Sequence, residues 1–136
     1  MADEEKKVAK PRASQKKKAA RQVPHAQVHV HASYNNTIAT LTDVNGNTLT
    51  WSSAGHCGFK GPKKSTPFAA SQVIEDLAKR ALPFGIKEVN VLVTGIGTGR
   101  DSCIRTLHAV GWHVLSIKDV TATPHNGCRP PKPRRL

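Results

Sequence analysis

The amino-acid sequence predicts an α/β fold on a mixed five-stranded sheet, with basic extensions at both ends of the chain. Two observations carry this prediction: the order of the segments and the distribution of charge. Three strand-like segments joined by short turns come first, and a helix, a strand, a second helix and a last strand follow. Because short turns join antiparallel strands and helical crossovers join parallel ones, we expect a three-strand antiparallel meander followed by an α-β-α-β segment.

Charge divides the chain of 136 residues into three parts. Residues 1–22 hold eight bases and three acids, and residues 124–136 hold four bases and no acid, so the two ends supply +9 of the net charge of +12. The segment 23–123 has the length of one domain and carries only +3. A nearly neutral domain between two cationic arms is typical of proteins that bind a large polyanion such as nucleic acid.

Residues 1–22 are rich in Lys and Ala and lack apolar periodicity, which predicts a flexible arm. The first strand is expected over 27–32, where Val28 and Val30 alternate with His29 and His31 as in a half-buried strand. Two histidines on one face can ligate a metal. Without a third ligand, we interpret them as exposed strand residues, and we predict no metal site.

Two further strands complete the meander. Residues 34–36 form a turn, and residues 37–42 are rich in β-branched side chains, which favours a strand. Asn45-Gly46 suits a second turn with positive φ, and residues 47–52 form the third strand. Leu49 and Trp51 are expected to lie on the same side of this strand.

A loop rich in glycine and lysine, residues 55–66, leads directly into the first helix. Thr66 is expected to cap this helix, Pro67 to occupy its first position, and Pro83 to end it. Apolar side chains recur at helical spacing and predict the face that packs on the core. They are Ile74, Leu77, Ala78, Ala81 and Leu82.

The second half of the domain reads as strand, helix and strand. Residues 88–94 carry valines on one face and Leu92 on the other, typical of a strand covered on both faces. A second glycine loop, residues 95–100, leads into a short helix over 101–110 that Gly111 closes. Residues 113–120 form the fifth strand.

The C-terminal tail, residues 124–136, contains four prolines and is expected to be extended. Composition alone leaves two interpretations open: an arm that binds phosphate, or a solvated basic tail. Within it, Asn126-Gly127 is a pair that can cyclise and rearrange to isoaspartate when flexible. Rearrangement of Asn126 is therefore a hypothesis about this segment.

Cysteine usage and hydropathy predict a cytoplasmic protein. The three cysteines are odd in number and widely spaced, which indicates free thiols in a reducing compartment. The N-terminus has no apolar signal core, and no window is apolar for long enough to span a membrane. We therefore expect no membrane partner.

The chain is predicted not to be an enzyme and to need no cofactor. Pro62 lacks the amide that a P-loop would supply, and Gly95-x-Gly97-x-Gly99 is one residue shorter than the dinucleotide fingerprint. The βββαβα order is also that of the ribonuclease H-like architecture, whose nucleases hold two metals with carboxylates. Residues 23–42 contain no acid, so the ligands for such chemistry are missing and no catalytic residue is predicted.

Both loops nonetheless suit a phosphate. A helix N-terminus offers amides and a favourable dipole to an anion. Gly97 and Gly99 allow close approach of a backbone, with Arg100 beside them and Arg105 further along the helix. A merely solvated lysine loop, and a glycine turn needed for packing, remain alternatives. The candidate residues of the first loop are Lys60, Lys63, Lys64, Ser65 and Thr66.

Four groups of residues form a distinctive set: Asn35-Asn36-Thr37-Ile38; Gly58-Phe59-Lys60-Gly61 with Lys64-Ser65-Thr66-Pro67; Gly97-Thr98-Gly99-Arg100; and Asp119-Val120-Thr121 with Pro124-His125-Asn126-Gly127-Cys128-Arg129-Pro130-Pro131. Together they resemble the small-subunit ribosomal protein S-eleven family in its bacterial or organellar form. The resemblance runs from about residue 23 to the C-terminus, and the Pro-His-Asn-Gly-Cys-Arg-Pro segment is its most specific part. The chain departs from the family pattern at Pro62 and Pro133.

The resemblance implies a ribonuclease H-like fold and a structural role on the platform of the small ribosomal subunit. There such a protein bridges helices of the small-subunit rRNA and helps to form the cleft that holds the mRNA Shine-Dalgarno duplex. The implied partners are the rRNA, the mRNA near this cleft, ribosomal proteins S-seven and S-eighteen, and initiation factor three.

Together with the loop residues above, the resemblance gives the predicted RNA-binding set: Asn35, Asn36, Lys60, Lys63, Lys64, Ser65, Thr66, Gly97, Gly99, Arg100, Arg105, His125, Asn126, Arg129, Lys132, Arg134 and Arg135. Two other classes of function remain alternatives. A nucleotide-dependent enzyme would bind nucleotide as an isolated domain. A free regulator of one RNA hairpin would form a tight complex without other ribosomal proteins.

Overall fold

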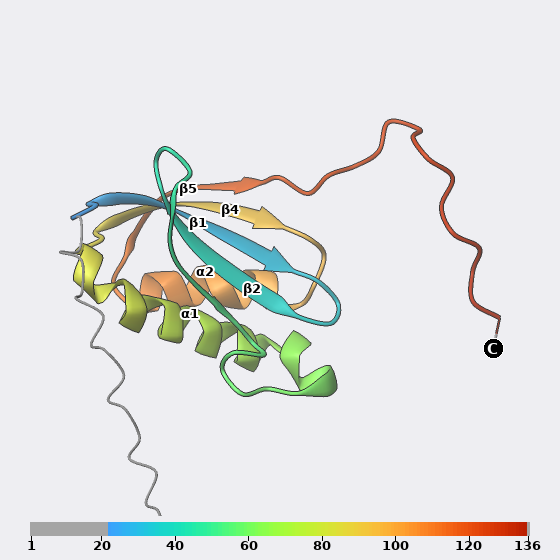
Figure 1. Cartoon of the computed structure of the whole chain (residues 1–136), viewed down its shortest axis with the longest axis horizontal. Helices are drawn as coiled ribbons and strands as arrows, with labels where there is room; N and C mark the ends of the chain where they lie inside the picture. The colour runs from blue at the N-terminus through green and yellow to red at the C-terminus, as the bar shows by residue number, and fades with distance from the viewer. Residues whose placement is uncertain (1–21, 136) are drawn as a thin grey trace, which may run out of the picture.

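The computed structural model describes residues 22–135, and the N-terminal arm expected over 1–22 lies almost entirely outside them. One mixed sheet of five strands carries two helices (Figure 1). The strands are β1 (His25–Ala32), β2 (Thr37–Asp43), β3 (Thr48–Ser53), β4 (Glu88–Thr94) and β5 (His113–Asp119). The helices are α1 (Pro67–Ala81) and α2 (Gly99–Ala109), with the short 3-10 turns η1 (Gly61–Ser65) and η2 (Leu82–Phe84).

The strand order is β3-β2-β1-β4-β5. β2 is antiparallel to both β1 and β3, whereas β4 is parallel to β1, and β5 is parallel to β4. The predicted meander followed by α-β-α-β is therefore confirmed, and with it the ribonuclease H-like α/β arrangement. β1 begins two residues earlier than predicted, because His25 and Ala26 already pair with Glu88 and Val89 of β4.

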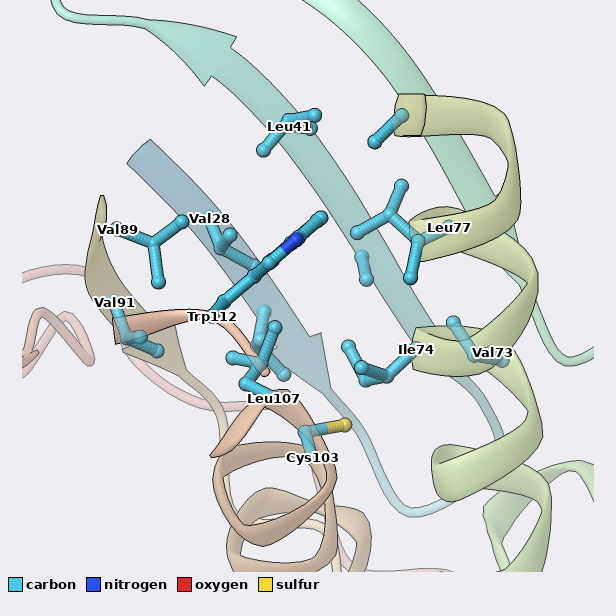
Figure 2. Close-up of a cluster of buried hydrophobic side chains, with 14 of the residues drawn as sticks. Val28, Leu41, Val73, Ile74, Leu77, Val89, Val91, Cys103, Leu107 and Trp112 are labelled. Carbon is cyan, nitrogen blue, oxygen red and sulfur yellow. The ribbon is translucent and has the colours of Figure 1, made fainter. Parts of the chain in front are cut away.

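Both helices pack on the same face of the sheet (Figure 1). The connections through α1 and α2 advance in the same direction across the sheet, and right-handed crossovers then place both helices on one side. Figure 2 shows Ile74 and Leu77 of α1, with Leu107 of α2, packed against the valines of β1 and β4. Each such fully buried aliphatic side chain contributes about 1.5–3 kcal/mol to folding.

The expectation that β4 is covered on both faces was wrong. Val89, Val91 and Val93 are buried, but Leu92 on the other face is only half-buried. Within residues 22–135, neither helix covers that second face. Apolar side chains on both faces of a strand therefore did not mean that both faces of β4 are buried.

The expected alternation of β3 is broken by a bulge. The register with β2 shifts between Leu41 and Thr42, whose partners are Thr50 and Thr48, so Leu49 is left unpaired. Leu49 packs against the core, whereas the side chain of Trp51 is 50% exposed. The two side chains thus differ in burial instead of sharing a side, because one extra residue in a strand reverses its alternation.

α1 begins and ends close to its predicted limits. The Thr66 side chain accepts a hydrogen bond from the Ala69 amide at 3.3 Å, which is the expected N-cap. The predicted core stripe is buried from Ile74 to Ala81, but Leu82 is 77% exposed. The helix ends at Ala81 and Leu82 opens the 3-10 turn η2, so the spacing that would bury Leu82 no longer applies.

Candidate nucleic-acid interface

The β1–β2 turn, the loop that leads into α1 and the loop between β4 and α2 lie at one end of the sheet, where the C-terminal tail also begins (Figure 1). Strands β1, β4 and β5 are parallel, so the segments that follow them emerge at the same edge. We call this the carboxyl end and define it as residues 33–36, 60–66, 95–98 and 120–135. In open α/β sheets, ligands bind preferentially at this edge.

The lysine loop folds into the turn η1, which presents its cations. Lys60 and Lys63 are exposed and Lys64 is half-buried. None of the three lysines has an ion-pair partner within residues 22–135. The hydroxyl of Ser65 donates to the Pro62 carbonyl at 3.0 Å, and that of Thr66 donates to the Lys63 carbonyl at 2.8 Å. These hydroxyls therefore hold the loop in shape, while the lysines remain available to an anion.

The glycine loop between β4 and α2 packs tightly on the end of β1. The Gly97 amide donates to the Ala32 carbonyl at 2.8 Å, and a Cβ added to Gly97 would lie 2.3 Å from the Ser33 carbonyl oxygen. A Cβ added to Gly99 would lie 2.7 Å from the Thr37 hydroxyl. Both glycines are therefore required for packing. Their contact with RNA stays a prediction.

A hydrogen bond that the sequence did not predict joins the two loops. The Thr98 hydroxyl donates to the Ser65 carbonyl at 2.8 Å, across 33 positions of sequence. The lysine loop and the glycine loop are thereby held side by side at the N-termini of α1 and α2. A lone threonine before a helix gives no sequence signal for this contact.

Arg100 already has partners within the protein. Its guanidinium donates to the Asp119 carboxylate at 2.6 Å and also to the Gly95 carbonyl. Asp119 accepts further hydrogen bonds from Thr121, from its amide at 2.9 Å and its hydroxyl at 2.6 Å. We call these four residues, Gly95, Arg100, Asp119 and Thr121, the exit clamp, because they lie where the tail leaves β5.

The clamp holds the pKa of the Asp119 carboxyl well below its usual range, first through the Arg100 hydrogen bond and then through those from Thr121. A lowered pKa means that the charged carboxylate is favoured by folding. This contribution to stability is complete above the unfolded pKa of about 3.9 and is lost progressively as the pH falls below it. The clamp is therefore fully formed at neutral pH.

The β1–β2 turn places the two asparagines differently. The Asn36 side-chain carbonyl accepts from the Thr37 amide at 2.9 Å, so part of this side chain serves the turn. The Ser33 hydroxyl accepts from the Asn36 amide at 3.1 Å and closes the turn. Asn35 is exposed at the same end. Only Asn35 therefore has its whole side chain available at the surface.

The remaining predicted residues lie on α2 and in the tail. Arg105 is exposed and has no ion-pair partner in the described part of the chain. Residues 120–135 form no helix or strand, and from residue 122 the tail runs away from the body (Figure 1). The tail residues of the predicted set are all exposed; they are His125, Asn126, Arg129, Lys132, Arg134 and Arg135.

Other kinds of site find no support among residues 22–135. No group of three or more His, Cys, Asp and Glu side chains there is arranged to hold a metal ion. Burial raises the pKa of the Cys103 thiol to about 12, which keeps it protonated and unreactive. None of the helices in this range is long and apolar enough to cross a membrane.

The chain is similar to known ribosomal proteins over most of its length. The model of the family described as "Ribosomal protein S11" matches residues 26–135. The "Small ribosomal subunit protein uS11" of Chromohalobacter salexigens is 54% identical over 129 residues, which cover 95% of this chain and 100% of that protein. The protein of the same name from Nitratidesulfovibrio vulgaris is 50% identical over 129 residues, with the same coverage. The chain therefore belongs to the ribosomal protein S11 family, a family of non-enzymatic proteins.

Proposed function

We propose that this protein is a structural constituent of the small ribosomal subunit and that it binds small-subunit rRNA through its carboxyl end. The observation that carries the proposal is the convergence of the lysine loop, the glycine loop and the basic tail at that end (Figure 1). Family membership supports the ribosomal role. The choice of the residues that contact RNA is argued from the geometry of the carboxyl end.

The charge balance of the carboxyl end favours a phosphate backbone as ligand. Three lysines of the loop and four bases of the tail have no acidic partner within the described residues. Of the acids nearby, Asp119 is neutralised by Arg100, and Asp101 lies in the first turn of α2. Each phosphate that such cations neutralise releases counterions, which drives binding and makes it dependent on salt.

The shape of the carboxyl end supports bridging between RNA helices. The lysine loop and glycine loop form a compact surface on the body, whereas the tail extends away from it. An extended chain spans about 3.3 Å per residue, so residues 124–135 can reach on the order of 40 Å beyond the body. A body that docks by shape and an arm that passes between helices can contact two RNA elements at once.

The proposed RNA contacts are the residues of the predicted set other than Arg100, whose guanidinium has partners within the protein. The family resemblance adds finer proposals that the same surface can serve. They are a position on the platform, a contribution to the Shine-Dalgarno cleft near the mRNA, and contacts with ribosomal proteins S-seven and S-eighteen and with initiation factor three.

Sedimentation tests the proposal most directly. A cell lysate is run through sucrose gradients at low and at moderate salt, and the protein is followed with an antibody. We expect it to migrate with small subunits and whole ribosomes at both salt concentrations, because contacts of shape add to the salt-sensitive phosphate contacts. A protein found only at the top of the gradient would overturn the proposal and favour a free regulator of one RNA hairpin.

A further inference from the structure

We propose that Arg100 is a positioning residue, which directs the C-terminal tail toward RNA through the exit clamp and does not itself bind phosphate. This inference rests on the proposed function. It differs from the sequence prediction, which placed Arg100 among the direct RNA contacts. The reason for the change is that the structure gives its guanidinium two partners inside the protein.

The clamp joins two segments that are distant in sequence, residues 95–100 and residues 119–121. The Gly95 amide, after β4, donates to the Thr121 hydroxyl at 3.2 Å, and Arg100 from α2 donates to the Gly95 carbonyl. Next to it, the Val120 amide donates to the Val93 carbonyl at 2.9 Å, which extends the β4–β5 pairing by one bond. Residues 119–121 are thus fixed by both backbone and side chains.

The fixation stops immediately beyond the clamp. From residue 122 to residue 135 no hydrogen bond connects the tail to the rest of the described chain. Thr121 is half-buried, whereas every residue from 122 to 135 is exposed. The clamp is therefore the last anchored point of the chain, and its geometry sets the direction in which the tail leaves the body.

The charge of Arg100 is already compensated. The Arg100 and Asp119 side chains are 28% and 52% exposed, so both lie at the surface, where each is the ion-pair partner of the other. The guanidinium uses two of its five N–H groups on Asp119 and Gly95, and a phosphate that approached the others would be repelled by the adjacent Asp119 carboxylate. The lysines of η1 and the bases of the tail have no acidic partner within the described residues. Arg100 therefore adds little to the number of counterions released on binding.

Anchoring the first residues of the tail lowers the cost of ordering it on RNA. Fixing the backbone of a residue costs conformational entropy, and the clamp has already fixed residues 119–121 in the free protein. A tail that starts in the correct direction also has fewer conformations to lose on binding. Loss of the clamp should therefore weaken RNA binding without removing any phosphate contact.

The test compares two acids at the same end, Asp119 in the clamp and Asp101, which has no hydrogen bond or ion pair within residues 22–135. The full chain and its variants are titrated with small-subunit rRNA over a range of salt. If only electrostatics mattered, Asp119→Asn and Asp101→Asn would both tighten binding, because each removes a negative charge. We expect Asp119→Asn to bind about ten-fold more weakly and Asp101→Asn to bind equally well or better.

Arg100→Gln separates positioning from phosphate contact. We expect a loss similar to that of Asp119→Asn, with an unchanged slope of log affinity against log salt. The double variant should be no weaker than either single variant, since both remove the same clamp. If Arg100→Gln lowers the slope by about one, as the loss of a phosphate contact does, the proposal is wrong. Tighter binding by Asp119→Asn would also overturn it.

A measurement on the free protein keeps this inference separate from the proposed function. Backbone amide order parameters of residues 120–123 are determined by NMR for the wild type, Asp119→Asn, Thr121→Val and Thr121→Ser. We expect lower order at residues 120–122 in the first two variants and near wild-type order in Thr121→Ser, which keeps the hydroxyl. Unchanged order in all variants would refute the clamp. Absence of rRNA binding by the wild type would instead refute the proposed function.

Discussion

The two ends of the sheet use the same residue type for different purposes. At the carboxyl end, Gly97 leaves no space for a side chain, since an added Cβ would lie 2.3 Å from a backbone oxygen. At the opposite end, which comprises residues 43–47, 82–87 and 110–112, Gly111 has open space around it but a φ of 94°. One glycine is required by packing and the other by backbone conformation.

The two ends also differ in how their cations are paired. Toward the opposite end, Arg80 pairs with Asp76 at 2.9 Å, and only Lys79 and Lys87 have no ion-pair partner among the described residues there. At the carboxyl end the lysines of η1 have no acidic partner in residues 22–135. Cations without an acidic partner are therefore concentrated on the lysine loop and the tail, next to a tightly packed glycine loop, and this combination marks the carboxyl end as the contact surface.

The largest expected effect comes from filling the space at Gly97. Gly97→Ala should destabilise the fold by about 3 kcal/mol, because the backbone of β1 must move. Gly111→Ala should cost only about 1 kcal/mol, the strain of a positive φ. Urea unfolding of both variants measures the difference. Equal costs would mean that the tight packing at the carboxyl end is relieved easily and that the contrast between the two glycines is not real.

Removing the tail should affect binding but not folding. Deletion of residues 124–136 removes four bases, so the slope of log affinity against log salt should fall by roughly 3 to 4. Affinity for small-subunit rRNA should drop on the order of 100-fold at moderate salt. The free energy of unfolding, measured with urea, should change by less than about 0.5 kcal/mol, because the tail is exposed. Unchanged assembly of the truncated chain into subunits would contradict the role of the tail.

Two pairs of lysines compare the ends directly. Lys63→Gln with Lys64→Gln removes two cations from η1, and Lys79→Gln with Lys87→Gln removes two from the opposite half of the molecule. The first double variant should bind rRNA about ten-fold more weakly, whereas the second should stay within about two-fold of wild type. A similar loss for both would show a diffuse electrostatic attraction in place of a defined surface.

A smaller effect is expected from the bond between the loops. Thr98→Val removes the hydroxyl that donates to the Ser65 carbonyl, which should cost about 1 kcal/mol of stability. Thr98→Ser keeps the donor and serves as the control. Urea unfolding measures both variants. A valine variant as stable as the serine variant would mean that the hydrogen bond does not hold the two loops together.

The smallest effect is a chemical one, with two Asn-Gly pairs to compare. The Gly46 amide donates to the Asp43 carbonyl at 2.9 Å, which restrains its attack on the Asn45 side chain. The Gly127 amide has no hydrogen-bond partner in the described chain, and Asn126 is exposed. Peptide mapping of aged free protein should therefore find isoaspartate at Asn126 earlier than at Asn45. Intact Asn126 alongside rearranged Asn45 would contradict this.

The order of the elements, the basic composition of the tail and the family could all be predicted from the sequence alone. Local signals sufficed for them: the periods of strand and helix, the cap at Thr66, the turn at Asn45-Gly46 and the Pro-rich tail motif. These properties depend on neighbouring residues, and neighbours are visible in a sequence.

Only the tertiary structure decided which residues meet. Thr98 bonds to Ser65 across 33 positions, and Thr121 bonds to Gly95 across 26. Arg100 pairs with Asp119 across 19 positions, a contact that the sequence did not predict. The bulge in β3 and the single covered face of the sheet depend likewise on register and crossover direction. Such contacts join segments that are far apart in the sequence, and the periodicity of neighbouring residues does not reveal them. They form only after the parallel strands have paired in register and brought their carboxyl ends to one edge of the sheet.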